Sequence, residues 1–226
     1  MRFLPFILMM AALFGLARPA AAASEELTES RRVIERAAVT VERMKLNESY
    51  KGDVEPQLKK ARAVLIVPSM VKAGFILGGE YGNGALLVRD ASGGFGEPAF
   101  YKVMTGSVGF QAGIQDAEVL FLIMTDKALN AILENRFKGG AEVSVAVVRG
   151  AGIEASTTSN VGADVLAFSL TVGLFAGGSL EGAVIESRTS WNNHYYGSVE
   201  ANPRTILFER RFTSSDSARL RQLLVQ

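Results

Sequence analysis

Few side chains in this sequence could act as catalysts, and their types limit the chemistry open to it. The chain has one histidine, His194, and no cysteine. Without cysteine there is no thiolate nucleophile and no sulfur-ligated zinc or iron–sulfur cluster, and one histidine cannot supply a multi-histidine metal site. His194 lies among aromatic and amide residues, where a lone histidine is more often a hydrogen-bonded structural residue than a general base.

Two glycine-rich segments come close to known signatures but lack a required feature. Residues 177–182 carry Glu181 two positions after Ser179, where a nucleophile elbow needs glycine. Residues 78–84 lack the G-x-G-x-x-G spacing and a following helix, and the sequence has no Gly-Lys-Ser/Thr phosphate loop. Carboxylates such as Asp164 and Glu181 are expected to partner buried polar groups or to face solvent. We therefore expect a protein that is not an enzyme and that uses no cofactor or metal.

Composition and charge narrow the choice of partners. The chain has 226 residues, of which 48% are hydrophobic and 21% charged, and its formal net charge is +1. These values exclude a disordered chain, a collagen-like repeat and a disulfide scaffold. Because no global field draws the protein to nucleic acid, we expect no nucleic-acid partner, and an anionic partner must meet a local basic patch.

The first 23 residues have the pattern of a secretory signal peptide. Met1-Arg2-Phe3 is a short positive region, residues 4–17 are apolar, and Ala21-Ala22-Ala23 forms an A-x-A-like cleavage site. The apolar run is shorter than the roughly 20 residues that span a bilayer, and an uncleaved anchor is the alternative. We expect residues 1–23 to be removed and residues 24–226 to form one exported domain. The expected location is the periplasm, with peripheral membrane association.

Residues 24–46 are expected to form an amphipathic helix, because they contain no glycine or proline and repeat apolar residues such as Ile34 and Val41 at helical spacing. The opposite side carries three arginines in a narrow arc: Arg32, Arg36 and Arg43. This arc is either a cationic face for anionic lipid headgroups or the solvated face of a packed helix, since Glu25 and Glu29 share it. The apolar stripe can pack on a sheet or enter a membrane, but not both at once.

Short apolar runs replace the helical pattern from residue 63 onward and predict strands. Residues 63–67 form a buried strand that Pro68 ends, and Gly82-Asn83-Gly84 predicts a hairpin turn between strands 75–81 and 85–89. The further expected strands are 99–104, 107–115, 118–124, 143–148, 165–170, 174–186 and 206–208. The further expected helices are 54–61 with Asp53 as N-cap, 127–136 with Asp126 as N-cap, and 214–224.

Most of the 23 glycines lie between Gly74 and Gly197, within the predicted strands. Glycines in such positions suit bulges, tight bends and close backbone approach, which curl a sheet. We therefore predict an α+β fold in one domain. Its core is a strongly curved, glycine-rich antiparallel β-sheet, or a barrel-like core, with N-terminal, central and C-terminal helices.

Three glycine-rich strings stand out. They are FILGGEYGNG at residues 75–84, GSVGFQAG at residues 106–113, and GLFAGGSLEG at residues 173–182, which Tyr195-Tyr196-Gly197 follows at a distance. These strings resemble those of the SYLF domain, a lipid-binding domain family. The resemblance covers nearly all of the chain after residue 23.

The resemblance implies a non-enzymatic domain that binds phospholipids, with phosphoinositides as ligands in the eukaryotic members. It also implies that an amphipathic segment at the N-terminus of the domain contributes to membrane binding, and residues 31–45 occupy that place here. An exported protein does not ordinarily meet phosphoinositides, so anionic bacterial phospholipid or lipopolysaccharide is the expected lipid. The glycines are expected to be structural.

We expect basic residues to bind the anionic headgroups. The candidate lipid-binding residues are Arg31, Arg32, Arg36, Arg43, Lys45, Lys59, Lys60 and Lys72. The next candidates are Arg62 and, in the basic tail, Arg204, Arg210 and Arg211. The alternative is a structural or adaptor protein of the envelope that binds another protein, and an enzyme using a carboxylate or His194 has the least support.

Overall fold

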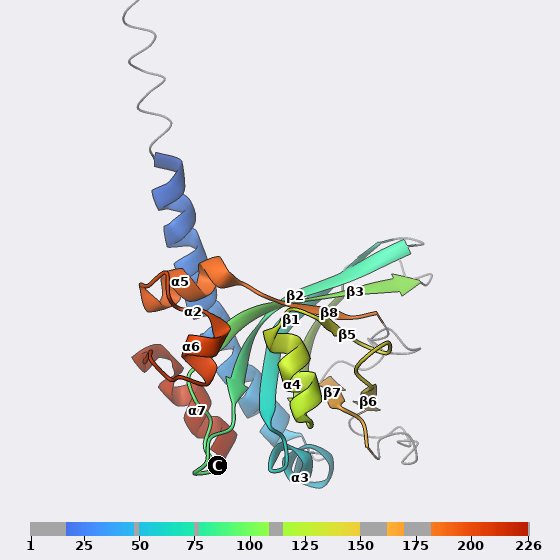
Figure 1. The fold of residues 1–226 in the computed structure, drawn as a ribbon. Helices are drawn as coiled ribbons and strands as arrows, with labels where there is room; N and C mark the ends of the chain where they lie inside the picture. Colours follow the sequence, from blue (N-terminus) through green and yellow to red (C-terminus); the bar gives the residue numbers. More distant parts are fainter. Residues whose placement is uncertain are drawn as a thin grey trace, which may run out of the picture.

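The computed structural model describes residues 17–47, 50–74, 77–108, 115–149, 162–169 and 182–225. In this part of the chain eight strands form one sheet in the order β5-β8-β3-β2-β1-β4-β7-β6, with helices packed around it. The sheet curls strongly into a half-barrel (Figure 1). The predicted α+β fold with a curved sheet and N-terminal, central and C-terminal helices is confirmed.

The elements follow one another in a simple order along the chain. The helices are α2 (Ala17–Leu46), α3 (Glu55–Leu58), α4 (Asp126–Leu133), α5 (Thr189–Tyr196), α6 (Pro203–Leu207) and α7 (Ala218–Val225), with the helical turns η1 (Tyr50–Val54) and η2 (Ser215–Ser217). The strands are β1 (Ala63–Gly74), β2 (Leu77–Val88), β3 (Ala99–Val108), β4 (Gln115–Ile123), β5 (Phe137–Lys138), β6 (Val145–Arg149), β7 (Val165–Ser169) and β8 (Val184–Ser187).

The sheet is mixed rather than purely antiparallel, which corrects the prediction. Strands β6 and β7 pair in parallel, with Val145 opposite Val165, and the other pairs of neighbouring strands are antiparallel. Apolar runs in the sequence show which segments become strands. They do not show the direction of pairing, which depends on how the connection crosses over.

Both faces of the sheet are covered, because alternate residues of each strand point to opposite sides. Leu65 and Val67 of β1 face a core that includes Ile132 of α4 and Ile206 of α6. Ile66 and its neighbours on the same face join the other core. That second core contains α2, α3, Trp191 of α5 and two leucines of α7.

Helix α2 packs on the sheet along its apolar stripe. Ile34 is 1% exposed and lies in one core with Val64 and Ile66 of β1. The predicted helix 24–46 is therefore confirmed. Of the two alternatives for its apolar stripe, packing on the sheet is the one observed. The helix begins at Ala17, and its N-terminal end extends beyond the body of the fold (Figure 1). The helix continues across the expected cleavage site between residues 23 and 24, and cleavage at that site stays a prediction.

Strand β1 continues through Pro68, where the sequence predicted its end. The pairing register of β1 shifts between Ile66 and Met70 toward β2, and between Val67 and Met70 toward β4. Proline lacks the N–H that a regular ladder needs, and an irregularity of this kind accommodates it.

The predicted hairpin turn at Gly82-Asn83-Gly84 is wrong, because these residues lie inside β2. A Cβ on Gly82 would lie 2.7 Å from the Ser69 carbonyl oxygen, and one on Gly84 would lie 2.6 Å from that of Ile66. The glycines thus allow close approach to β1, a role that produces the same sequence pattern as a turn.

Local capping also differs from the predictions. Helix α4 uses Thr125 rather than Asp126 as its N-cap, with the Ala128 N–H donating to the threonine hydroxyl. Asp53 lies in the π-helical turn η1, and Val54 is the N-cap of α3 without a side-chain hydrogen bond.

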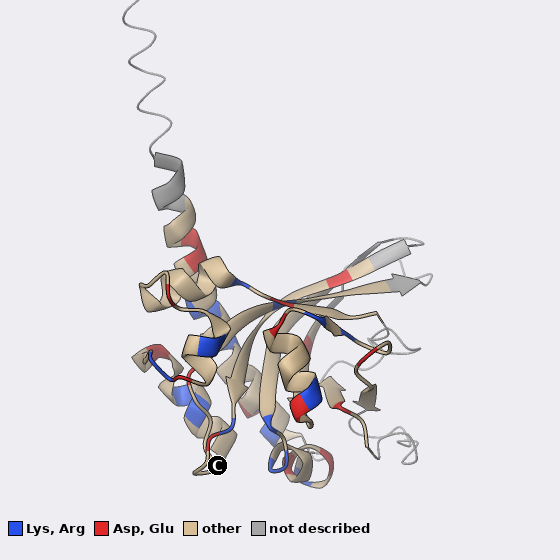
Figure 2. Cartoon of the chain, in the orientation of Figure 1, with Lys and Arg blue, Asp and Glu red and all other residues tan. Residues whose placement is uncertain are grey.

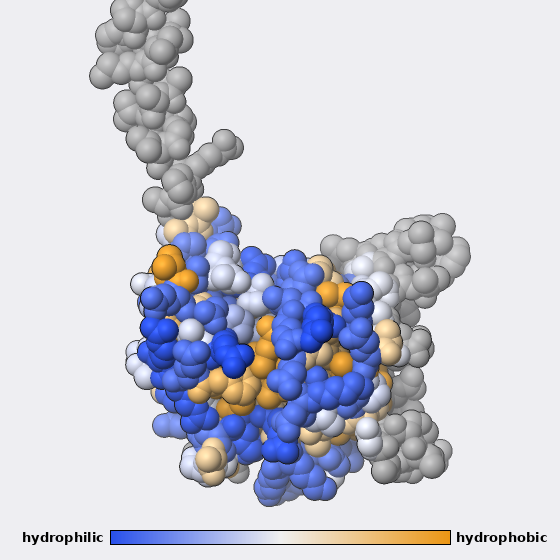
Figure 3. All heavy atoms as spheres, viewed as in Figure 1, coloured by the Kyte–Doolittle hydropathy of each residue, from blue (hydrophilic) through white to orange (hydrophobic). Residues whose placement is uncertain are grey.

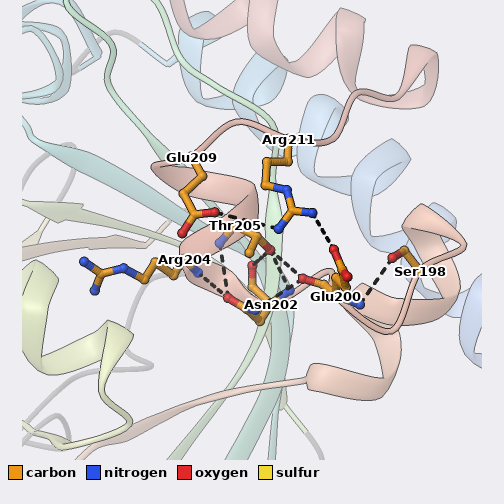
Figure 4. A network of polar contacts seen from close by, with 7 residues as sticks. All are labelled: Ser198, Glu200, Asn202, Arg204, Thr205, Glu209 and Arg211. Atoms are coloured by element: carbon orange, nitrogen blue, oxygen red, sulfur yellow. Dashed lines mark hydrogen bonds and ion pairs between the residues drawn. The ribbon is translucent and has the colours of Figure 1, made fainter.

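The expected strand 206–208 is instead the end of helix α6. Asn202 and Thr205 form a capping box at its start (Figure 4). The predicted strand 174–186 is found only as β8, and residues 174–181 lie outside the described residues.

Candidate functional site

The arginines predicted on α2 lie on its outward side, where most of them meet carboxylates. We call this surface the arginine face; its charged residues are Glu29, Arg31, Arg32, Glu35, Arg36, Glu42, Arg43, Glu118, Asp216 and Arg219. The Arg31 Nε lies 3.0 Å from the Asp216 Oδ2, and Arg32 pairs with Glu29 one turn earlier. Five basic and five acidic residues leave this face close to neutral.

Arg43 connects α2 to the sheet. Its Nη1 donates to the Glu118 Oε1 of β4 at 3.0 Å, and the Thr40 hydroxyl donates to the same oxygen at 3.0 Å. Arg36 differs from Arg31, Arg32 and Arg43 because it forms no ion pair with any residue in the described ranges. Among the four arginines predicted on α2, Arg36 is therefore the one that has no carboxylate partner in the described ranges.

A groove of about 740 Å³ lies over part of the arginine face. Its lining residues are Glu35, Arg36, Val39 and Arg43 of α2, Pro68 of β1, Ala117 and Glu118 of β4, and Arg219 of α7. The Arg219 Nη2 donates to both carboxylate oxygens of Glu42 at 2.8 and 2.7 Å. Both signs of charge therefore border the groove.

The predicted lysines gather elsewhere, where α2 ends and α3 follows. We call this region the lysine tip; it consists of Lys45, Leu46, Lys51, Asp53, Glu55, Lys59 and Lys60. Figure 2 shows basic residues around α3 at the lower end of the molecule. Four lysines face two carboxylates among the described residues of this segment, so the lysine tip has a surplus of positive charge.

Electrostatic interactions link three of these lysines to the Glu55 carboxylate. The Lys59 Nζ lies 2.7 Å from the Glu55 Oε1. This hydrogen bond and the charges of Lys59, Lys51 and Lys45 hold the pKa of the Glu55 carboxyl below its usual value. Lys45 is half-buried, and its burial lowers the pKa of its ammonium group, while Glu55 and Glu42 oppose that change. Glu55 therefore stays ionised at the centre of the group.

Leu46 adds an apolar side chain to the lysine tip. It is the last residue of α2 and is 85% exposed, although one face of this helix is buried. Lys51, Lys59 and Lys60 are exposed as well. The surface around α3 at the lower end of Figure 3 is otherwise hydrophilic. An exposed leucine beside exposed lysines is the combination that suits the interface of an anionic membrane.

The remaining predicted residues lie apart from both regions. Arg62 pairs with Asp126 at 3.5 Å. Lys72 lies near the other end of β1, opposite Glu80 of β2 and Gln115 of β4 in register. The structure therefore does not bring Lys72 together with the lysine tip.

The basic tail is largely engaged in local contacts (Figure 4). Arg211 pairs with Glu200 and lies 3.9 Å from Glu209, and Arg210 lies 3.9 Å from Asp90. The guanidinium of Arg204 extends away from the network. These contacts order the loop around α6 and do not form a common site with the lysine tip.

His194 has the structural surroundings that its neighbours predicted. Its Nδ1 lies 2.8 Å from the Glu26 Oε2, and the other oxygen of Glu26 accepts a hydrogen bond from the Ser190 hydroxyl at 3.0 Å. The group thereby joins α5 to α2. No grouping of three or more histidines or carboxylates suited to a metal occurs in the described ranges.

Asp164 partners polar groups, as predicted. It accepts hydrogen bonds from the Thr125 and Ser144 hydroxyls at 2.8 and 2.9 Å. Burial alone raises the pKa of this carboxyl, but bonds from Ser144, Thr125 and Lys127 outweigh it and leave the pKa lowered. Glu181 lies outside the described residues.

Sequence reasoning missed Lys51 and Leu46. The spacing of lysines from position 45 to position 60 was a usable signal for Lys51. Leu46 gave no such signal, because an apolar residue at the end of an amphipathic helix is expected to join the buried stripe. No helix within the described ranges combines the length and apolar character needed to cross a bilayer.

Comparison with known proteins places these observations in a family. The model of the family described as "Ysc84: Las17-binding protein actin regulator" matches residues 104–226. LAS seventeen-binding protein 3 of Saccharomyces cerevisiae is 32% identical over 144 residues, which are 62% of this chain and 31% of that protein. SH3 domain-containing YSC84-like protein 1 is 28% identical in Xenopus laevis, over 71% of this chain and 48% of the relative, and 28% identical in Homo sapiens, over 62% and 41%.

The chain spans between about a third and a half of the length of these relatives. No solved structure matches it. The relatives are named for binding and regulation rather than for catalysis. The matched range contains two of the three glycine-rich strings, those at residues 106–113 and 173–182. Since the family model covers more than half of the sequence, the chain belongs to the Ysc84 (SYLF) family.

Proposed function

We propose that this protein is a non-enzymatic binding protein of the cell envelope that attaches to anionic phospholipid surfaces through its lysine tip. The observation that carries the proposal is that Leu46, Lys51 and Lys60 are all exposed in one short segment, and that neither lysine forms an ion pair with a residue in the described ranges. A lysine near an anionic membrane contributes about 1 kcal/mol. An exposed leucine adds an apolar group that can enter the interface.

The arginine face is the weaker candidate for the same role. Arg31, Arg32 and Arg43 each have a carboxylate partner, so a lipid phosphate has to compete with that partner. Carboxylates on the same face also repel a phosphate. Arg36, which has no such partner within the described ranges, can supplement the lysine tip. Clustered lysines also suit a headgroup with several phosphates, which is the chemistry of phosphoinositide-type ligands.

Co-sedimentation with vesicles tests the proposal. The probe is the chain without residues 1–23, mixed with phosphatidylcholine vesicles that contain phosphatidylglycerol. The combined substitutions Lys51→Gln, Lys59→Gln and Lys60→Gln are expected to remove about 2 kcal/mol, on the order of thirtyfold in affinity at low salt, because Lys59 is already paired with Glu55. Rising salt is expected to weaken binding of the unsubstituted protein.

The matched control variant replaces three arginines, Arg31→Gln, Arg32→Gln and Arg43→Gln, and so removes the same charge from the other region. We expect its vesicle affinity to fall less than about threefold, because carboxylate partners already neutralise these side chains. Circular dichroism verifies that both variants fold. A larger loss in the arginine variant than in the lysine variant would contradict the assignment to the lysine tip.

A protein-binding or adaptor role is the second candidate. The family description and the name of the yeast relative favour it, since both refer to Las17 binding. Unchanged vesicle binding in both variants, or binding that does not depend on anionic lipid, would favour this second role. The envelope location rests on the sequence of residues 1–23. Intact-mass measurement of exported protein is expected to place the new N-terminus within one or two residues of Ser24, and retention of Met1 would contradict export by cleavage.

A further inference from the structure

The outward side of α2 has a second pattern besides its arginines. Side chains that are exposed or half-buried recur at alternating spacings of four and three residues: Thr28, Arg32, Glu35, Val39, Glu42 and Leu46. This spacing places the six residues along one face of the helix, with Val39 and Leu46 as its apolar members. Val39, at the middle of the stripe, is an apolar residue that is 42% exposed.

We propose that this stripe pairs antiparallel with α2 of a second copy of the chain, with the two-fold axis at Val39. In this register each residue lies opposite the one that is equally far from Val39 on the other side. Glu35 then lies opposite the partner's Arg43, and Arg36 lies opposite the partner's Glu42. Two-fold symmetry repeats both contacts, so four pairs of opposite charge surround two facing valines.

Charge determines the direction of the pairing. A parallel arrangement would place Glu35 opposite the partner's Glu35 and Arg36 opposite the partner's Arg36, which repel. In the described ranges neither Glu35 nor Arg36 forms an ion pair, so each gains an opposite charge in the antiparallel arrangement. Arg43 and Glu42 can keep their existing partners, because a guanidinium has five donors and the two oxygens of a carboxylate together offer about four lone-pair sites.

The groove described above favours the same occupant. Glu35, Arg36, Val39 and Arg43 all line it, and the eight helical steps from Glu35 to Arg43 span about 12 Å at the rise of an α-helix. Residues of both signs line the groove, so a uniformly acidic or basic partner would meet repulsion. The same face of a second copy carries charges of both signs, in an order that places each one opposite a charge of the other sign. Lys51, Lys59 and Lys60 lie beyond this stretch, so the pairing does not use these three lysines, whereas Leu46 belongs both to the stripe and to the lysine tip.

Crosslinking gives the sharpest test, because the chain has no cysteine of its own. In the Val39→Cys variant the two introduced thiols face each other across the axis, and mild oxidation is expected to give a disulfide-linked dimer. The matched control is Val199→Cys, at a residue that is 88% exposed and lies outside α2. We expect Val39→Cys to crosslink at least about tenfold faster than Val199→Cys at equal protein concentration. Equal rates would overturn the proposal.

Charge reversal tests the register. Sedimentation equilibrium is expected to show self-association of the unsubstituted chain. In Arg36→Glu the association should be weaker by about tenfold or more, because the new carboxylate lies opposite the partner's Glu42 twice per dimer. Arg204→Glu makes the same change at an exposed residue of α6 and is expected to have no effect. A chain that stays monomeric at millimolar concentration, or that pairs equally well after Arg36→Glu, would overturn the proposal.

A mixing experiment identifies the contact itself. The double variant Glu42→Arg, Arg219→Glu keeps the ion pair between α2 and α7 with its charges exchanged. Mixed with Arg36→Glu, it again sets opposite charges against each other at positions 36 and 42, so we expect the mixture to associate more tightly than either variant alone. Failure of the mixture to do so, with both variants folded by circular dichroism, would contradict this register.

Discussion

The arginine face and the lysine tip contain basic residues that follow one another closely in the sequence, but the fold uses them differently. On the arginine face, Arg31, Arg43 and Arg219 pair with Asp216, Glu118 and Glu42 and hold α2 against η2, β4 and α7. At the lysine tip, exposed lysines surround one ionised carboxylate, Glu55. Basic charge on the first region therefore supports packing, while at the second region Lys51 and Lys60 form no ion pair with a residue in the described ranges.

The side-chain types suit these two uses. The planar fork of arginine presents its donors to a carboxylate in a fixed geometry. In this structure the Arg219 Nη2 donates to both oxygens of Glu42. Lysine carries a compact, strongly hydrated charge on a flexible stem, which suits a fluid anionic surface. The difference can be tested at four levels.

The largest effect is expected in the buried stripe that fixes α2 to the sheet. Ile34→Ala removes a side chain that is 1% exposed and should lower the free energy of unfolding by about 2–5 kcal/mol. Leu46→Ala, at the 85% exposed end of the same helix, should change it by no more than about 0.5 kcal/mol. Urea denaturation measures both. If Ile34→Ala were as mild as Leu46→Ala, α2 would not be packed on the sheet in solution.

The apolar component of the lysine tip comes next. Leu46→Ser should weaken binding to anionic vesicles by about tenfold, because a leucine that enters the interface gains about 1.5 kcal/mol. Its matched control is Val199→Ser, which alters an equally exposed apolar residue outside the lysine tip and should leave binding unchanged. Co-sedimentation measures both affinities. An equal effect of the two changes would mean that Leu46 does not enter the membrane.

Removing the carboxylate at the centre of the lysine tip should act in the opposite direction. Glu55→Gln takes away a negative charge and should strengthen vesicle binding by about fivefold, because one charge fewer is then repelled by the anionic surface. The pKa of Glu55 is lowered, so its carboxylate stays ionised as the pH falls from 8 to 5. Protonation of Glu55 should therefore strengthen vesicle binding only at a pH below the usual pKa range of a glutamate. This strengthening should be absent in Glu55→Gln. Enhancement between pH 7 and 5 would argue for a different titrating group.

The smallest effect is expected at an ion pair of the arginine face. A double-mutant cycle with Arg43→Gln and Glu118→Gln should give a coupling energy of about 0.2–1 kcal/mol in unfolding experiments, since the Arg43 side chain is 63% exposed and the Glu118 side chain 19%. No coupling would mean that the pair does not hold α2 on β4. The same single variants should change vesicle affinity little, which separates this region from the lysine tip.

Sequence patterns predicted the elements of this fold better than their boundaries. Helical spacing in residues 24–46 identified α2 and its buried side, because periodicity reports directly on which side chains avoid water. Gly82 and Gly84 were misread as a turn, because glycine is needed both where the chain reverses and where two backbones approach closely. Pro68 was misread as a strand end for a similar reason, since only the register of three paired strands reveals the irregularity that accommodates it.

The sequence by itself excluded thiol chemistry and sulfur-ligated metals, established the amphipathic first helix, and located the basic residues from which a site could be built. Only the tertiary structure decided which of those residues have partners. Asp216 is 185 positions away from Arg31, Glu118 is 75 positions away from Arg43, and Arg219 is 177 positions away from Glu42. Helical periodicity reports on neighbours three or four residues apart, whereas an ion pair depends on distance in space, which the curled sheet and the docking of α7 determine.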